Sequence, residues 1–273
     1  MSLNWRFAVG IRSVRSRAAL AETTRRYADA GFGVLNVPDH LGAPAPFPVL
    51  AAAAQASETM RVGTYVLNVG FYKPALLARD IADLHTVSGG RFDAGLGAGY
   101  VREEFEAAEL PFPSAGERVG HLERVTAYLK RHTPDVPIMI AGNGDRVLRL
   151  AARHADIIGL TGADVGKDTA DPLAERIGYV RAAAGERFAE VVLDMAITAA
   201  PARDETVPDL TLTRQYAPGA SDEQLLARPS VLSGTPAEAA DKVRMLRETY
   251  GITSFSVQKN HADYFAAVIG ELR

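Results

Sequence analysis

RFDAGLGAGY, residues 91–100, is a short apolar run that ends in glycines at alternate positions, Gly95, Gly97 and Gly99. The pattern GLGAG is not the dinucleotide-binding fingerprint G-x-G-x-x-G, because its last glycine comes one residue early. No acidic residue lies about 20 positions on at the end of a following strand either. We therefore interpret the stretch as a buried strand with a bare end, in which Gly95 marks a close backbone approach.

Outward from this stretch, short apolar runs alternate with longer amphipathic segments. We expect strands at 6–11, 33–37, 61–67, 91–97, 136–142, 156–161, 190–199 and 253–257, each followed by helical periodicity. Eight such units in 273 residues are typical of a (β/α)8 TIM barrel. A doubly wound open sheet shares the alternation. The count of eight and the even composition favour the barrel, as a single domain over 1–273.

The segment 201–233 interrupts the alternation, because it is rich in proline and in turn-forming residues. In a barrel it follows the seventh strand, and it would lie over the active-site face as an irregular insertion. A surface insertion without function is the other interpretation. Directly after it, Thr235 and Pro236 have the residue types expected at a helix N-cap and first helical position.

Composition excludes several classes of function. The net charge of −3, without a basic stripe, argues against nucleic-acid binding. The chain has no cysteine and its six histidines are scattered, so we expect no metal site. Neither a membrane-length apolar stretch nor an uninterrupted signal-peptide core is present, since Arg6 and Arg12 break the N-terminal run. We expect a cytoplasmic protein without membrane contacts.

Residues able to do chemistry follow the expected strand ends, where barrels place their active sites. Asp39 and His40 follow the second strand, and such a pair can orient an imidazole as acid, base or hydrogen-bond donor. A turn-capping Asp39 beside an exposed His40 is the simpler interpretation. Tyr65 and Asn68 end the third strand, and a bulged strand end before a helix start at Pro74 is the simpler interpretation.

The turn after the fifth strand contains Gly142, Asn143, Gly144 and Asp145 and leads into a helix. Small residues at a helix N-terminus expose backbone N–H groups and the positive end of the helix dipole, which together bind phosphate well. The alternative is a tight turn capped by Asn143 or Asp145. The P-loop and nucleophile-elbow motifs are absent from the sequence.

Four stretches carry a resemblance to a known family, namely VPDHL at 37–41 and the segments 62–100, 136–160 and 233–257. In these stretches the chain resembles the bacterial luciferase-like monooxygenase superfamily. The similarity is strongest to the oxidoreductases of that superfamily that use the deazaflavin coenzyme F420. The segment 62–100 is the most specific of the four.

The resemblance implies a barrel with the cofactor ring in its mouth and the cofactor phosphate at the turn after the fifth strand. It also implies a non-prolyl cis peptide bond at Tyr65–Val66 behind the ring. The cofactor-binding residues that it implies are Asp39, His40, Tyr65, Val66, Asn68, Gly97, Ala98, Gly99, Gly142, Asn143 and Gly144.

One position departs from the family pattern. In the sugar-phosphate dehydrogenases of the superfamily, a glutamate after the Gly-x-Gly donates a proton, and Tyr100 stands at that position here. Tyr100 can still donate a hydrogen bond, and Glu103 and Glu104 lie one turn further on. We take His40 and Tyr100 as the candidate catalytic residues.

Three functions are consistent with these patterns. The first is F420-dependent hydride transfer to or from a small organic substrate. The second is a monooxygenase that uses FMN reduced by a separate reductase, and the third is a barrel that binds a phosphorylated ligand without redox chemistry. The resemblance also implies a homodimer. We expect substrate contacts around 43–47, 71–73 and 201–233, where Phe47, Phe71 and Tyr72 either line a cleft or pack in the core.

Overall fold

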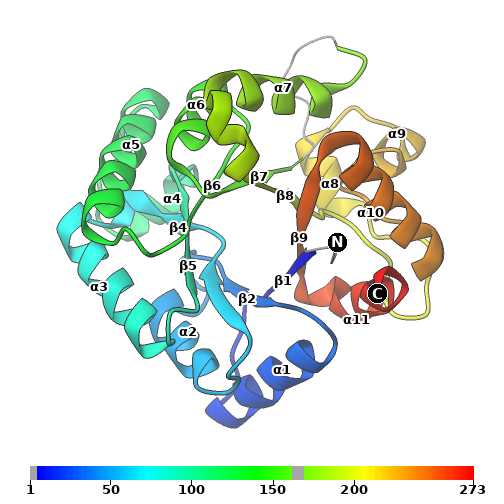
Figure 1. Ribbon diagram of the computed structural model, residues 1–273, viewed down its shortest axis with the longest axis horizontal. Helices are drawn as coiled ribbons and strands as arrows, with labels where there is room; N and C mark the ends of the chain where they lie inside the picture. The colour runs from blue at the N-terminus through cyan, green and yellow to red at the C-terminus, as the bar shows by residue number, and fades with distance from the viewer. Residues whose placement is uncertain (1–4, 162–168) are drawn as a thin grey trace.

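The computed structural model describes residues 5–161 and 169–273, and its strands form a closed barrel inside a ring of helices (Figure 1). All of the strand pairings are parallel, and the order β3-β2-β1-β9-β8-β7-β6-β5-β4 is closed by a further pairing of β3 with β5. The predicted (β/α)8 barrel is confirmed. The strands are β1 (Arg6–Gly10), β2 (Val34–Val37), β3 (Arg61–Thr64), β4 (Leu67–Asn68), β5 (Phe92–Gly97), β6 (Ile138–Ala141), β7 (Ile157–Leu160), β8 (Val192–Ala196) and β9 (Ile252–Gln258).

The third barrel strand is interrupted, and the prediction of one continuous strand over 61–67 is wrong in this respect. The peptide bond between Tyr65 and Val66 is cis, as the family resemblance implied. Tyr65 and Val66 belong to neither β3 nor β4, although the Tyr65 N–H still donates to the carbonyl oxygen of Val37 at 3.0 Å. Both β3 and β4 pair with β5, and together they fill one of the eight places in the barrel.

Helices cover the outside of the barrel, and several begin as their sequences predict. Thr235 is the N-cap of α10 and forms a capping box with Glu238, while Pro236 is the first helical residue. Within the described residues, no helix has the length and apolarity needed to cross a membrane. The helices around the barrel are α1 (Arg17–Asp29), α2 (Pro46–Ala54), α3 (Pro74–Val87), α4 (Arg102–Ala107), α5 (Ala115–His132), α6 (Asp145–His154), α7 (Pro172–Ala184), α10 (Pro236–Tyr250) and α11 (Ala262–Leu272).

The insertion 201–233 lies between β8 and α10, as predicted, but it is less irregular than its composition suggests. It contains two short helices, α8 (Thr211–Tyr216) and α9 (Asp222–Leu226). A bridge joins Ala199 to Val231, and Lys242 of α10 donates to the carbonyl oxygens of Arg228 and Val231 at 2.8 and 2.7 Å. The C-terminal end of the insertion is therefore fastened to α10 and to the segment that follows β8.

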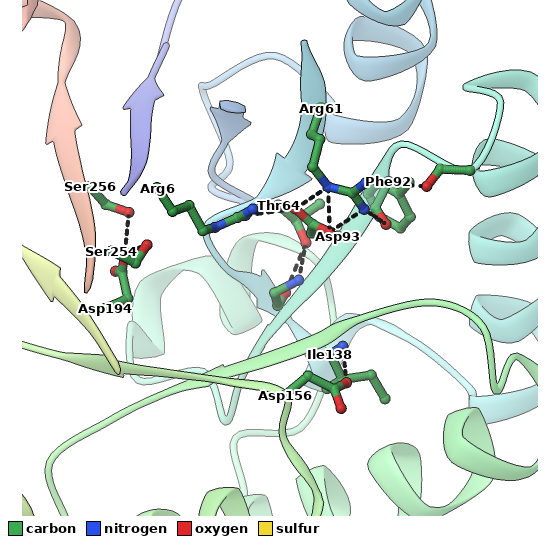
Figure 2. A network of polar contacts seen from close by, with 12 residues as sticks. Arg6, Arg61, Thr64, Phe92, Asp93, Ile138, Asp156, Asp194, Ser254 and Ser256 are labelled. Carbon is green, nitrogen blue, oxygen red and sulfur yellow. Dashed lines mark hydrogen bonds and ion pairs between the residues drawn. The ribbon is translucent and has the colours of Figure 1, made fainter. Parts of the chain in front are cut away.

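A buried carboxylate organises the N-terminal end of the barrel, opposite the strand ends. Asp93 of β5 accepts hydrogen bonds from Arg6 of β1 and Arg61 of β3, both at 2.6 Å (Figure 2). Its side chain is 5% exposed, and each oxygen faces a guanidinium. Ion pairs with two guanidinium groups compensate the cost of burying this carboxylate. This end of the barrel is therefore a structural one, which leaves the other end for function.

Close packing along β5 explains its first glycine. The Thr64 hydroxyl donates to the carbonyl oxygen of Gly95 at 2.9 Å and accepts from its N–H at 2.8 Å. A Cβ atom on Gly95 would lie 1.9 Å from the carbonyl oxygen of Thr64. The sequence interpretation of Gly95 as a point of close backbone approach is confirmed.

Candidate active site

A cavity of about 530 Å³ opens where the strands end. Its size is within the range of small-molecule sites, about 300–1,000 Å³. Every candidate site residue except Gly144 lines it. Gly144 lies beside it as the N-cap of α6. The candidates on the cavity wall are Asp39, His40, Tyr65, Val66, Asn68, Gly97, Ala98, Gly99, Tyr100, Gly142 and Asn143.

His40 is held at the cavity wall by a carboxylate from a different element. Its Nδ1 lies 2.8 Å from Oε1 of Glu104 on α4. An ionised carboxylate can only accept, so Nδ1 carries a proton. The other ring nitrogen, Nε2, has no partner among the described residues, and it can exchange a proton with a ligand. The structure thus shows His40 as an imidazole oriented by Glu104, and not merely as an exposed side chain.

In the sequence, Glu104 stands out only as a residue one turn after Tyr100. The helix α4 begins two residues after Tyr100, and its first turn places Glu104 facing the loop after β2. The Glu104 side chain is 14% exposed, which is low for a glutamate in the first turn of an outer helix. A partner 64 positions away from His40 leaves no local signal in the sequence.

Asp39 ties two strand ends together instead of capping its own turn. Its Oδ2 accepts from the backbone N–H of Asn68 at 3.1 Å, and Oδ1 of Asn68 accepts from the N–H of Gly70 at 3.0 Å. Burial raises the pKa of Asp39, against the hydrogen bonds from Asn68 and Tyr72 that favour the carboxylate. Asp39 thereby ties the end of β4 to the loop that carries His40.

Asp194 of β8 accepts hydrogen bonds from three hydroxyl groups, although its side chain is almost inaccessible to solvent. Tyr65 donates to its Oδ2 at 3.0 Å. Ser254 and Ser256 donate to its Oδ1 at 2.6 and 3.0 Å (Figure 2). Burial is the largest cause of the raised pKa of Asp194. Asp194 was not among the residues predicted for the site. Its position inside the apolar run 191–199 is the feature of the sequence that could have indicated it.

Gly97, the last residue of β5, and Gly99, two residues further on, lie against residues next to the cis bond. A Cβ atom on Gly97 would come within 2.7 Å of Cγ2 of Val66. Gly99 has a φ of +73°, and a Cβ atom there would lie 2.1 Å from Oδ1 of Asn68. Packing against Val66 and Asn68 therefore requires glycine at both positions, and it leaves bare backbone on the cavity wall.

The turn between β6 and α6 differs from the capped turn that was the alternative interpretation. The Asn143 side chain hydrogen-bonds to the Thr161 hydroxyl, with Nδ2 and Oγ1 2.8 Å apart. Asp145 accepts from Arg176, and no side chain of the described segments caps α6. The N-terminus of this ten-residue helix is therefore able to bind an anion at the edge of the cavity.

Two exposed tyrosines stand at the cavity mouth. Tyr100 is 74% exposed, and Tyr216 of α8 is 50% exposed. Phe47, Phe71 and Tyr72 do not line the cavity. The ring of Phe47 packs on Tyr72 and that of Phe71 on Phe105 of α4. Core packing, not a cleft, explains these three residues.

Comparison with known proteins identifies relatives for much of the chain. The sequence model of the family described as luciferase-like monooxygenase matches residues 1–253. An F420-dependent glucose-6-phosphate dehydrogenase of Beutenbergia cavernae is 33% identical over 160 residues, which are 46% of this chain and 47% of that protein. A 5,10-methylenetetrahydromethanopterin reductase of Archaeoglobus fulgidus is 28% identical over 148 residues, 47% of this chain and 44% of the reductase. The matches thus span about half the length of these curated relatives.

Solved structures share the fold along nearly the whole chain. The coenzyme F420-dependent tetrahydromethanopterin reductase of Methanopyrus kandleri has a TM-score of 0.78 at 17% identity, with 98% of each chain covered. A long-chain alkane monooxygenase has a TM-score of 0.77 at 13% identity, with 100% of this chain and 92% of that chain covered. These likenesses show the shared fold. The match of the family model over residues 1–253 shows that the chain belongs to the luciferase-like monooxygenase family.

Proposed function

We propose that this protein is an F420-dependent oxidoreductase that transfers a hydride between the deazaflavin and a small organic substrate. The observation that carries the proposal is the His40–Glu104 pair at the wall of the cavity. Oxidation of an alcohol by hydride removal also requires a base for the hydroxyl proton, and the reverse reaction requires an acid. Relatives that are F420-dependent glucose-6-phosphate dehydrogenases support the same cofactor.

The residues around the cavity fit a flat cofactor with a phosphate. The bare backbone of Gly97 and Gly99 and the Tyr65–Val66 peptide would hold the faces of the ring. The N-terminus of α6, beside Gly142, would hold the phosphate. When bound, the deazaflavin would accept or supply the hydride.

The protein's own groups would move the proton. Nε2 of His40 would take the hydroxyl proton of an alcohol substrate, or return it to a carbonyl oxygen. Glu104, which accepts from Nδ1, would stabilise the imidazolium that forms and keep the ring from rotating. Tyr100 at the mouth would donate a hydrogen bond to the substrate and take the place of the glutamate found in the sugar-phosphate dehydrogenases.

A flavin monooxygenase is the second candidate, and the family description and the fold shared with the alkane monooxygenase favour it. Such an enzyme would receive reduced FMN from a separate reductase. It would use the same cavity and the same phosphate site.

Titration of the purified chain with oxidised F420 and, separately, with FMN distinguishes the candidates. We expect F420 to bind at least about tenfold more tightly than FMN, which corresponds to about 1.4 kcal/mol. Binding of FMN without binding of F420 would support the monooxygenase. Binding of neither ring would support a barrel without redox chemistry.

A further inference from the structure

A second cavity, of about 460 Å³, adjoins the active-site cavity at the ends of β1 and β9. The two cavities share Gly10, Arg12 and Gln258. From these shared residues the second cavity extends to Arg26 of α1 and Asp263 of α11, the helices that follow β1 and β9. The two cavities are therefore neighbours that share part of their lining.

Positive charge dominates this second cavity. Arg12, Arg26 and Lys259 line it, with Asp263 as the carboxylate. Asp263 lies 3.7 Å from Arg26 and balances that charge. The side chains of Arg12 and Lys259 form no ion pair with any residue in 5–161 or 169–273. Two unbalanced cations beside a cavity, in a chain of net charge −3, create a local potential that attracts anions.

Aromatic side chains stand beside the same charges. Tyr100 and Tyr216 line the active-site cavity and remain largely exposed. Burial raises the pKa of Tyr216, Tyr100 adds to the rise, and Arg12 opposes it. These electrostatic effects, together with the shared lining, place the three side chains around one mouth. Exposed tyrosine rings offer flat apolar surface for contact with a ligand.

We propose that the substrate is a flat, aromatic or similarly planar molecule that carries a carboxylate or phosphate group. Its ring contacts Tyr100 and Tyr216, and its anionic group binds Arg12 and Lys259. This inference rests on the proposed function, because it assumes that a ring cofactor fills the inner part of the cavity.

The position of this cationic site separates it from the expected cofactor phosphate. The cofactor phosphate is expected at the turn between β6 and α6, whereas the cationic site lies at β1 and β9. The strands β7 and β8 stand between β6 and β9 in the barrel. The mouth thus offers two anion sites, one for the cofactor and one for the substrate.

Binding of naphthoate and of naphthamide, its uncharged analogue, tests the inference without knowledge of the natural substrate. The affinities of both probes are measured by calorimetry for the wild type, for Arg12→Gln with Lys259→Gln, and for Arg15→Gln. Arg15 is an exposed arginine that lines neither cavity and serves as the matched control. We expect the wild type and the control to prefer naphthoate by about tenfold, and the double variant to lose this preference. Tyr216→Ala should weaken both probes equally.

Each other outcome either contradicts the inference or shows that the inference holds while the proposed function fails. Equal or absent binding of the two probes by the wild type overturns it, as does a preference that survives in the double variant. If the double variant instead binds F420 more weakly and keeps its naphthoate preference, the cations serve the cofactor and the inference is wrong. A naphthoate preference in a wild type that binds no F420 supports the anion site and contradicts the proposed cofactor.

Discussion

His40 and Glu104 are 64 positions apart in the sequence, and their Nδ1 and Oε1 atoms are 2.8 Å apart in the structure. The contact joins the loop after β2 to the first turn of α4, across the wall of the cavity. Because the carboxylate can only accept, the contact selects which ring nitrogen is protonated. Nε2 is then the ring nitrogen left to exchange a proton with a ligand.

The tautomer of His40 provides a test that needs no substrate. We expect neutral His40 to carry its proton on Nδ1 in the wild type, and the Nδ1–H fraction to fall in Glu104→Met, which has similar length but no acceptor. Nitrogen NMR of the imidazole measures this fraction. Glu103→Met, which alters an exposed neighbour on the same helix, should leave the tautomer unchanged. An unchanged tautomer in Glu104→Met would show that the carboxylate does not orient the ring.

Gly95→Ala tests the close approach of β3 and β5. A methyl group at Gly95 would meet the Thr64 carbonyl oxygen at 1.9 Å, so the strands must separate. We expect a loss of about 3 kcal/mol or more in the free energy of unfolding, measured with urea. Gly178→Ala on α7 is the control, because no atom lies within 4 Å of its added methyl. It should be neutral or stabilise by up to about 1 kcal/mol, and equal behaviour of the two variants would contradict the packing argument.

The barrel could be predicted because its signals are local. Each apolar run followed by helical periodicity predicts one strand–helix unit, and Thr235 with Pro236 is sufficient to place the start of α10. The break at Tyr65–Val66 is different, since it depends on pairing with β5, some 30 residues further on. From the residues alone the third strand was continuous, and only the resemblance to a family indicated the cis bond.

The site could be predicted in part for the same reason. Strand ends converge in any barrel, so Asp39, His40 and Gly97 were expected near one another, and they line one cavity. Which partner each side chain chooses depends on tertiary packing. The carboxylate of Glu104 and the hydroxyl donors around Asp194 come from distant elements and were not predicted. The roles assigned to these residues in catalysis stay predictions.

The buried carboxylate of Asp194 should make stability depend on pH. Because burial raises its pKa in the folded state, the unfolded chain releases the proton first as the pH rises. The wild type should therefore lose stability between the ordinary aspartate pKa and the raised one. Asp194→Asn should lack this loss in urea unfolding measured across that range.

Two further variants at aspartates separate this effect from a general change of charge. Asp241→Asn alters a carboxylate that is 77% exposed, and it should keep the pH dependence of the wild type. Asp194→Ala leaves three hydroxyl donors without an acceptor and should cost about 1–3 kcal/mol below the ordinary aspartate pKa, and less at higher pH, where the wild type itself loses stability. A wild type and an Asp194→Asn variant with parallel pH profiles would refute the assignment.

Lys242 should hold the end of the insertion in place. Its ammonium donates to the carbonyl oxygens of Arg228 and Val231, and burial lowers its pKa to about 8. Lys242→Met removes these donors, so we expect faster amide hydrogen exchange in 226–234 with little change in the barrel strands. Arg244→Met on the same helix is the control. Unchanged exchange in Lys242→Met would mean that the segment is held by other contacts.

A crystal structure of the chain with bound oxidised F420 is the most direct test of the proposed function. We expect the deazaflavin ring between the Tyr65–Val66 peptide and the backbone of Gly97–Gly99, with its phosphate at the N-terminus of α6. We also expect Nε2 of His40 to face the space above the ring. A ring bound elsewhere, or a phosphate at Arg12 instead of α6, would contradict the proposal.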